Sequence, residues 1–178
     1  MVEALLCDMD GTLVQSNWLH AEAWQVALGA IGVHVELETL RRQIGKGGDE
    51  LIPMFVPWWT RKQVEEPLNA FRKRIFREDY MHRVTPFPKV REFLLRVKEA
   101  GIRPALASSV DRDDLTEYKR IANIVDLVEE ETSADDAKQS KPHPDIFSAA
   151  LRKLKLKPHQ CIALGDTPYD AEAAGLAR

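Results

Sequence analysis

The sequence of 178 residues has few cysteines and no long apolar segment. Its two cysteines, Cys7 and Cys161, lie in short apolar runs, which predicts small buried thiols in a reducing compartment and no disulfide framework. No apolar run approaches the ~20 residues that a membrane-spanning helix needs, and no signal-peptide pattern opens the chain. These absences predict a cytoplasmic protein without a membrane partner.

The sequence also lacks an excess of basic residues. Lys and Arg number 25 against 28 Asp and Glu, and the formal net charge is -3, so the composition predicts no nucleic-acid partner. The remaining composition is ordinary for a globular protein, and the length suffices for one good core and a subdomain. Oligomeric state stays open at this point.

The most informative stretch is residues 4–13, near the start of the chain. A short apolar run, typical of a buried strand, ends at Asp8 and Asp10, and Gly11 then permits a sharp bend. Open α/β sheets bind their ligands at the carboxyl ends of strands. Two carboxylates this close require a cation to be charged together, and a hard ion such as Mg2+ suits oxygen ligands. Taken alone, the pattern more often marks an ordinary Asp-Gly turn.

The order of elements predicts an α/β fold with an inserted helical segment. Residues 16–83 show helical patterns only, including a capping box of Thr60 and Gln63. Beyond them, helical patterns alternate with short apolar strands at 102–107, 124–128 and 161–164. This alternation predicts right-handed crossovers and a parallel sheet. We therefore expect a Rossmann-like core from residues 1–15 and 84–178 and an α-helical cap from residues 16–83.

Three further polar clusters fall where the same edge of this sheet is expected. Ser108 and Ser109 end the second strand, where a hydroxyl and free backbone N–H groups can hold a phosphate. Lys141 stands between a strand and a helix and is followed by Pro142, which stiffens the chain. The fourth strand runs into Gly165-Asp166, with Asp170 four residues later. Each cluster alone is also explained as a helix cap, an exposed loop lysine or an Asx-type turn.

Taken together and in order, these motifs resemble those of the haloacid dehalogenase-like (HAD) hydrolase superfamily. The matching segments are Asp8-Met9-Asp10-Gly11-Thr12, Ser108, Lys141-Pro142, and Gly165-Asp166 with Asp170. The helical insert resembles the small α-helical cap of that superfamily. His20, Trp24 and the 45–48 loop resemble the branch that includes phosphoglycolate phosphatase and β-phosphoglucomutase.

The resemblance implies a phosphatase that works through an aspartyl phosphate. In it, Asp8 would be the nucleophile, and Asp10 would protonate the leaving oxygen and then accept a proton from water. Ser108 and Lys141 would bind the oxygens of the transferring group. The substrate would be a small phosphorylated metabolite.

The resemblance also implies a Mg2+ ion and a set of substrate contacts. The ion would be held by Asp8, the backbone carbonyl of Asp10, and Asp166, with Asp170 binding directly or through water. The candidate substrate-binding residues are Ser109, His20, Lys46, Asp49 and one of the arginines near 72–77.

Several alternatives remain at this stage. Dehalogenases of the superfamily lack the second aspartate of the first motif, so Asp10 favours phosphoryl transfer. A sugar phosphomutase would grip a second phosphate with an arginine in the loop after the second cap helix, and that loop offers only Lys46. A non-catalytic domain is the third reading. Its support is that the sequence ends at residue 178, where members of the superfamily continue with a further strand and helix. We expect the sequence to be a fragment instead. The pair Trp58-Trp59 is either packed inside the cap or exposed.

Overall fold

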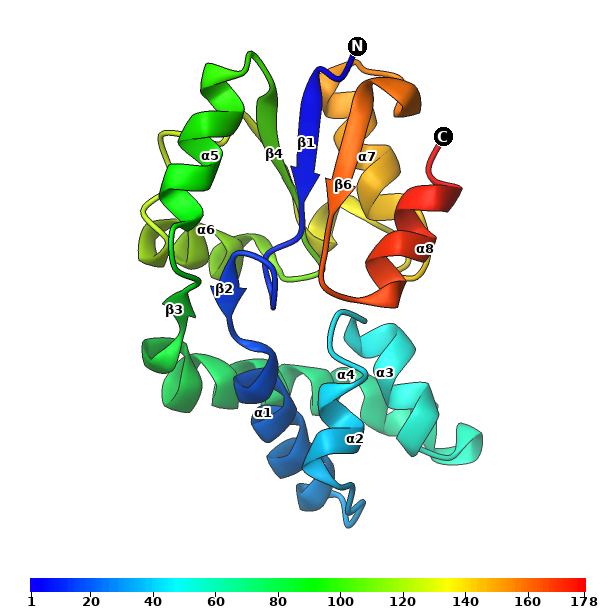
Figure 1. Cartoon of the computed structure of the whole chain (residues 1–178). Helices are drawn as coiled ribbons and strands as arrows, with labels where there is room; N and C mark the ends of the chain where they lie inside the picture. The colour runs from blue at the N-terminus through cyan, green and yellow to red at the C-terminus, as the bar shows by residue number, and fades with distance from the viewer.

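The computed structural model describes residues 1–178 and contains a parallel sheet between two layers of helices (Figure 1). The strands run in the order β5-β4-β1-β6. Their bounds are Ala4–Cys7 (β1), Arg103–Ala107 (β4), Glu130–Thr132 (β5) and Cys161–Leu164 (β6). The predicted α/β fold class is therefore confirmed.

Helices cover both faces of this sheet. One apolar cluster joins Leu5 and Cys7 of β1 to one pair of helices, and a second joins Ala4 and Leu6 to the other pair. Alternate residues of a strand point to opposite faces, so β1 serves both clusters and is entirely buried. The helices of these layers are α5 (Val90–Glu99), α6 (Arg112–Ile121), α7 (Asp145–Leu154) and α8 (Pro168–Leu176), with the 3-10 turns η3 (Ala134–Asp136) and η4 (Pro158–Gln160).

A second group of helices lies beyond the carboxyl end of β1, toward which the strand points in Figure 1. It contains α1 (Asn17–Ala30), α2 (Leu37–Arg41), α3 (Gly48–Phe55), α4 (Trp58–Ile75), the π-helical turn η1 (Phe76–Tyr80) and the 3-10 turn η2 (Met81–Arg83). These helices enclose an apolar cluster of their own, around Trp24, Leu40 and Leu51. None of the helices in the structure is long and apolar enough to cross a bilayer.

Two short strands connect the helical group to the sheet. β2 (Val14–Gln15) pairs antiparallel with β3 (Thr85–Pro86), so the chain enters and leaves the helical group side by side. Phe87 N also donates to Leu13 O at 3.1 Å. This ribbon was not expected from the sequence, because two-residue strands carry no periodic pattern.

Two local predictions were wrong. Residues 124–128 form a turn beneath α6, with Ile124 and Leu127 buried, and the third strand is β5 instead. The apolar side chains there are buried against a helix, whereas β5 is defined by its pairing with β4. The capping box of Thr60 is also absent, because the N-cap of α4 is Pro57, three residues earlier, and Thr60 lies in the first turn of the helix.

Two exposed features complete the fold. β6 forms one edge of the sheet, and its Ile162 is half exposed. Trp58 and Trp59, at the start of α4, are exposed and pack edge to face on each other. Of the two alternatives for this pair, packed inside the cap or exposed, the structure shows the exposed one.

Candidate active site

The site begins at the end of β1, where Asp8 and Asp10 are both buried. The chain bends after them because Gly11 adopts a φ of +76°, a conformation that residues with a Cβ atom rarely adopt. A Cβ atom on Gly11 would also collide with the side chains of Asp166 and Asn17. Gly11 thus lets the end of β6 approach the end of β1.

Lys141 is fully buried and reaches this point from the loop before α7. Its Nζ donates to Asp8 Oδ1 at 2.6 Å and to the carbonyl of Ala107, the last residue of β4, at 2.9 Å. It also lies 2.7 Å from Asp170 Oδ1, in a direction that leaves that buried oxygen without a hydrogen bond. One ammonium group therefore faces two buried carboxylates.

Asp8, Asp166 and Asp170 form a compact group of carboxylates. Each offers an oxygen within 4.8 Å of the others. Asp170 is oriented by α8, since its Oδ2 accepts hydrogen bonds from Thr167 Oγ1 at 2.5 Å and Thr167 N at 3.1 Å. Asp166 Oδ2 accepts one from Asn17 Nδ2 at 2.8 Å. Three carboxylates against the single ammonium group of Lys141 leave an excess of negative charge, and oxygen ligands with such an excess fit a hard divalent cation.

Burial has a large effect on Asp8. It raises the pKa of Asp8 to about 7, and the nearby carboxylates of Asp170 and Asp10 add to this rise while Lys141 opposes it. The pKa of Asp166 is also raised, first by burial and then by Asp170. A cation bound among these groups would favour their charged forms.

Asp10 faces away from the carboxylate group and belongs to a different network. Its Oδ1 accepts a hydrogen bond from Ser16 Oγ at 2.5 Å and lies 3.0 Å from His20 Nε2. The same Nε2 lies 2.9 Å from the Tyr118 hydroxyl, and the imidazole stacks on Phe76 at 3.8 Å. Burial alone would raise the pKa of Asp10, but the imidazole and these hydrogen bonds outweigh it and hold the pKa below its ordinary value. The resting Asp10 is therefore a carboxylate.

Comparison with known proteins identifies the arrangement. The chain matches the family described as haloacid dehalogenase-like hydrolase over residues 2–178. The chain belongs to the haloacid dehalogenase-like hydrolase family. The family and the enzyme class expected from the sequence, a phosphoric monoester hydrolase, are thus confirmed.

Individual relatives of this hydrolase agree with that assignment. It is 27% identical over 176 residues to a phosphorylated carbohydrates phosphatase of Thermotoga maritima, covering 97% of this chain and 80% of the relative. It is 25% identical over 181 residues to a phosphoglycolate phosphatase of Nitrosospira multiformis, covering 99% and 80%. A solved structure of CbbY from Rhodobacter sphaeroides in complex with phosphate aligns with a TM-score of 0.74 and 26% identity, covering 99% and 83%.

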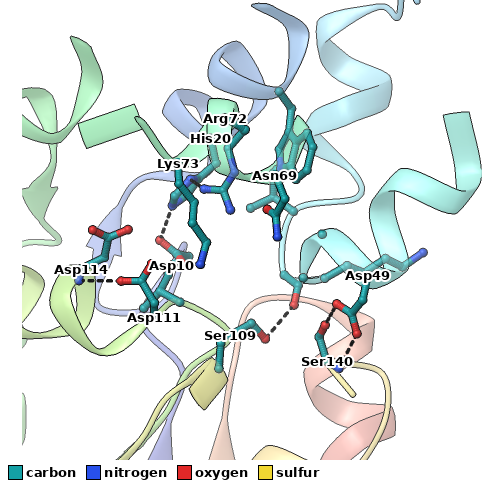
Figure 2. A pocket seen from close by; sticks show the side chains of 18 of the residues that line it. Asp10, His20, Asp49, Asn69, Arg72, Lys73, Ser109, Asp111, Asp114 and Ser140 are labelled. Carbon is teal, nitrogen blue, oxygen red and sulfur yellow. Dashed lines mark hydrogen bonds and ion pairs between the residues drawn. The ribbon is translucent and has the colours of Figure 1, made fainter. Parts of the chain in front are cut away.

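A cavity of about 450 Å³ lies between the two parts of this hydrolase (Figure 2). Most of its lining residues carry polar or charged groups, and they include Asp8, Asp10 and His20 together with residues of α3 and α4. Contacts across its rim join the parts. Ser109 Oγ donates to Gly45 O at 3.3 Å, and the N–H and hydroxyl of Ser140 donate to the two carboxylate oxygens of Asp49.

Ser108 and Lys46, two further residues predicted to bind the substrate, lie at or near this cavity. Ser108 is buried below it, and its Oγ accepts from Val110 N at 3.4 Å. Lys46 lines the cavity, but its Nζ donates to Gln43 Oε1 at 3.0 Å and lies 4.5 Å from the ring centre of Tyr169. The carboxylate of Asp10 is not among the clustered carboxylates of Asp8, Asp166 and Asp170.

Sequence reasoning missed three residues of this site. Ser16 and Asn17 hold Asp10 and Asp166, and Tyr118 contacts His20 from α6. Ser16 could have been recognised as a helix start, because a serine before a helical pattern marks one. Its hydrogen bond to Asp10, however, depends on the fold. Tyr118 sits in a helical pattern as an ordinary core residue would, so nothing in the sequence distinguishes it.

Proposed function

We propose that this hydrolase is a Mg2+-dependent phosphatase that acts on a small phosphorylated metabolite through an aspartyl phosphate on Asp8. The observation that carries the proposal is the separation of the two aspartates of the first motif. Asp8 is held by Lys141 beside two further carboxylates, while Asp10 is held by Ser16 and His20 on the side of the cavity. A nucleophile and a proton carrier require these two different surroundings.

In the first step, an oxygen of Asp8 attacks phosphorus and the bond from phosphorus to the ester oxygen breaks. Lys141 donates to Oδ1 of Asp8, which leaves the other oxygen for the attack. The leaving oxygen takes a proton from Asp10. Asp10 takes that proton from solvent when the phosphate dianion arrives beside it, since a nearby negative charge raises the pKa of a carboxyl group.

In the second step, water attacks phosphorus and gives a proton to Asp10, and the bond from phosphorus to Asp8 breaks. Inorganic phosphate leaves, and Asp8 returns to its carboxylate form. His20 keeps Asp10 oriented in both steps, since the imidazole is fixed between Phe76 and Tyr118. Ser108 and Lys141 are proposed to bind the oxygens of the transferring group.

Asp8, Asp166 and Asp170 would hold Mg2+, together with the backbone carbonyl of Asp10. The ion, when bound, supplies positive charge that reduces the repulsion between an anionic nucleophile and an anionic phosphate. Asn17 supports this role through its hydrogen bond to Asp166. Asp170 is oriented toward the group by its hydrogen bonds from Thr167.

The helical residues 16–83 are proposed to act as a cap that closes the cavity and selects the substrate, with Ser109, His20 and Lys46 near the bound metabolite. The polar lining and the volume of about 450 Å³ favour a small hydrophilic substrate. We place the enzyme in the cytoplasm. The phosphomutase alternative is disfavoured because Lys46, the only cation of the 45–49 loop, already contacts Gln43 and Tyr169.

The proposal is tested by hydrolysis of p-nitrophenyl phosphate with and without Mg2+. We expect turnover that requires the metal and is abolished by Asp8→Asn, whereas Asp79→Asn, at an exposed carboxylate, retains it. Acid-quenched enzyme should carry a phosphoryl group that hydroxylamine removes. A folded protein without turnover on this ester and on a panel of metabolites, at any Mg2+ concentration, would instead support the non-catalytic alternative.

A further inference from the structure

Asp166 is the least enclosed of the three clustered carboxylates. Asp8 and Asp170 are buried, and they lie 2.6 Å and 2.7 Å from the ammonium group of Lys141. Asp166 is exposed, and Lys141 forms no ion pair with it. Arg41 lies near enough for Asp166 to stabilise its charge, but its own ion pair is with a glutamate of the same helix, at 2.7 Å. The orientation of the Asp166 side chain therefore depends on uncharged donors.

Asn17 supplies the shorter of the two side-chain hydrogen bonds to this carboxylate. Asn17 Nδ2 donates to Asp166 Oδ2 at 2.8 Å, whereas Thr12 Oγ1 donates to Asp166 Oδ1 at 3.4 Å. Asn17 is the first residue of α1, and the hydrogen-bonded pair packs against Gly11, where a Cβ atom would collide with both side chains. The end of β6 and the first helix of the helical group thus meet at this contact.

The other polar atom of the Asn17 amide has no partner. Asn17 Oδ1 is buried and receives no hydrogen bond, and buried polar atoms in native proteins are rarely left in that state. A carboxylate only accepts hydrogen bonds, so Asp166 holds the amide with its nitrogen toward the carboxylate and leaves the oxygen free to accept one. Because both atoms belong to one small amide group, the free oxygen also lies close to Asp166.

We infer that Asn17 stabilises bound Mg2+ through both atoms of its amide: Nδ2 orients Asp166 toward the ion, and Oδ1 accepts a hydrogen bond from a water molecule bound to the ion. This role rests on the proposed function, because Asn17 acts on the ion proposed there. Mg2+ usually keeps several waters when it binds to a protein, so a donor for Oδ1 is available. Groups that orient the ligands of a metal typically contribute about 10- to 100-fold to its affinity.

Calorimetric titration with MgCl2 tests the inference. Asn17→Ala should raise the Kd for Mg2+ by about 10- to 100-fold. Alanine favours a helix, so the start of α1 should be preserved in this variant. Gln15→Ala is the matched control and should keep the wild-type Kd, since Gln15 is exposed, lies two residues earlier and donates to Thr85 and Pro86 of β3. An unchanged Kd in Asn17→Ala would overturn the inference.

Water-proton relaxation with Mn2+, an ion that accepts the same oxygen ligands, separates two actions of Asn17 Oδ1. This measurement counts the water ligands of the bound ion. If Oδ1 accepts a hydrogen bond from a water ligand, Asn17→Ala binds Mn2+ more weakly than the wild type but with the same number of water ligands. One additional water ligand in the variant would show that Oδ1 binds the ion itself, and the inference would then be wrong.

Urea unfolding separates the inferred role from a purely structural one. Mg2+ that binds only the folded protein raises the urea midpoint. We expect this rise to be smaller in Asn17→Ala than in the wild type, because the variant binds the ion more weakly. A structural role would instead lower the midpoint of Asn17→Ala equally with and without Mg2+, and that result would contradict the inference.

The outcomes also separate the role of Asn17 from the proposed function. Weaker Mg2+ binding by Asn17→Ala supports the inference even if no phosphate ester is turned over. Mg2+-dependent turnover, with equal Mg2+ affinity in the wild type and Asn17→Ala, overturns the inference and leaves the proposed function intact. A wild-type protein that binds no Mg2+ would overturn both.

Discussion

Replacing Lys141 by Met should destabilise this hydrolase in a way that depends on pH and Mg2+. The wild-type ammonium is fully buried, 2.6 Å from Asp8 Oδ1 and 2.7 Å from Asp170 Oδ1. Met fills a similar volume, so the loss measures charge and not a cavity. Removing one partner of a buried ion pair typically costs about 3–5 kcal/mol, because the other charge is left uncompensated. For a domain of this size, that corresponds to a fall in Tm of roughly 6–20 °C.

The direction of the pH dependence follows from the carboxylates. Burial already raises the pKa of Asp8 to about 7, and loss of Lys141, which lowers it, raises it further. A raised folded-state pKa means that charging the group penalises the folded protein as the pH rises from the unfolded value, about 3.9, toward the folded one. The penalty of Lys141→Met should therefore be small near pH 5, where Asp8 takes up a proton, and largest at pH 8.

Urea unfolding at pH 5 and pH 8, with and without Mg2+, measures this penalty. A divalent ion can replace part of the missing positive charge, so Mg2+ should recover part of the loss at pH 8. Lys141→Arg serves as the control that keeps the charge. A Lys141→Met protein as stable as the wild type at pH 8, or a loss that is the same at both pH values, would refute this account of the site.

Two further predictions concern the carboxylate group of Asp8, Asp166 and Asp170, the proposed Mg2+ site. Apparent Mg2+ affinity should fall as the pH drops below about 7, by up to about tenfold per pH unit, because the ion must compete with a proton on Asp8; calorimetric titration between pH 5.5 and 8.5 would show it, and a flat profile would contradict it. Gly11→Ala should cost about 1–3 kcal/mol in urea unfolding, because its φ is +76°, and should weaken Mg2+ binding because the new Cβ meets Asp166. Gly175→Ala, with no atom within 4 Å of the new Cβ, is the matched control and should unfold at an equal or higher urea concentration.

The arrangement of the candidate site residues could be predicted because it depends on topology. Parallel strands bring their carboxyl ends to one edge, so Asp8, Ser108 and Asp166 were expected together from their positions after strands alone. The resemblance to the HAD superfamily added Lys141, which the sequence presented only as a loop lysine before a helix. Its complete burial between two carboxylates supports that placement in the structure.

Other features depend on contacts between distant segments and carry no local signal. The run 124–128 has the residues of a strand, but whether a strand forms depends on which backbone lies beside β4, and that is β5. Arg72 and Arg74 are two residues apart and of the same type, so the sequence does not distinguish them. In the structure Arg72 lines the cavity, whereas Arg74 is not among its lining residues and pairs with Glu78.

The sequence by itself thus determined the α/β order, the family and the residues that follow each strand, since these depend on local pattern and chain direction. The tertiary structure alone decided that Asp8 lies with Asp166 and Asp170 and that Asp10 lies beside His20, because these partners come from segments that meet only in the folded protein. It also decided that Tyr118 and Arg72 meet at His20, since these side chains come from elements that pack together only in the folded protein.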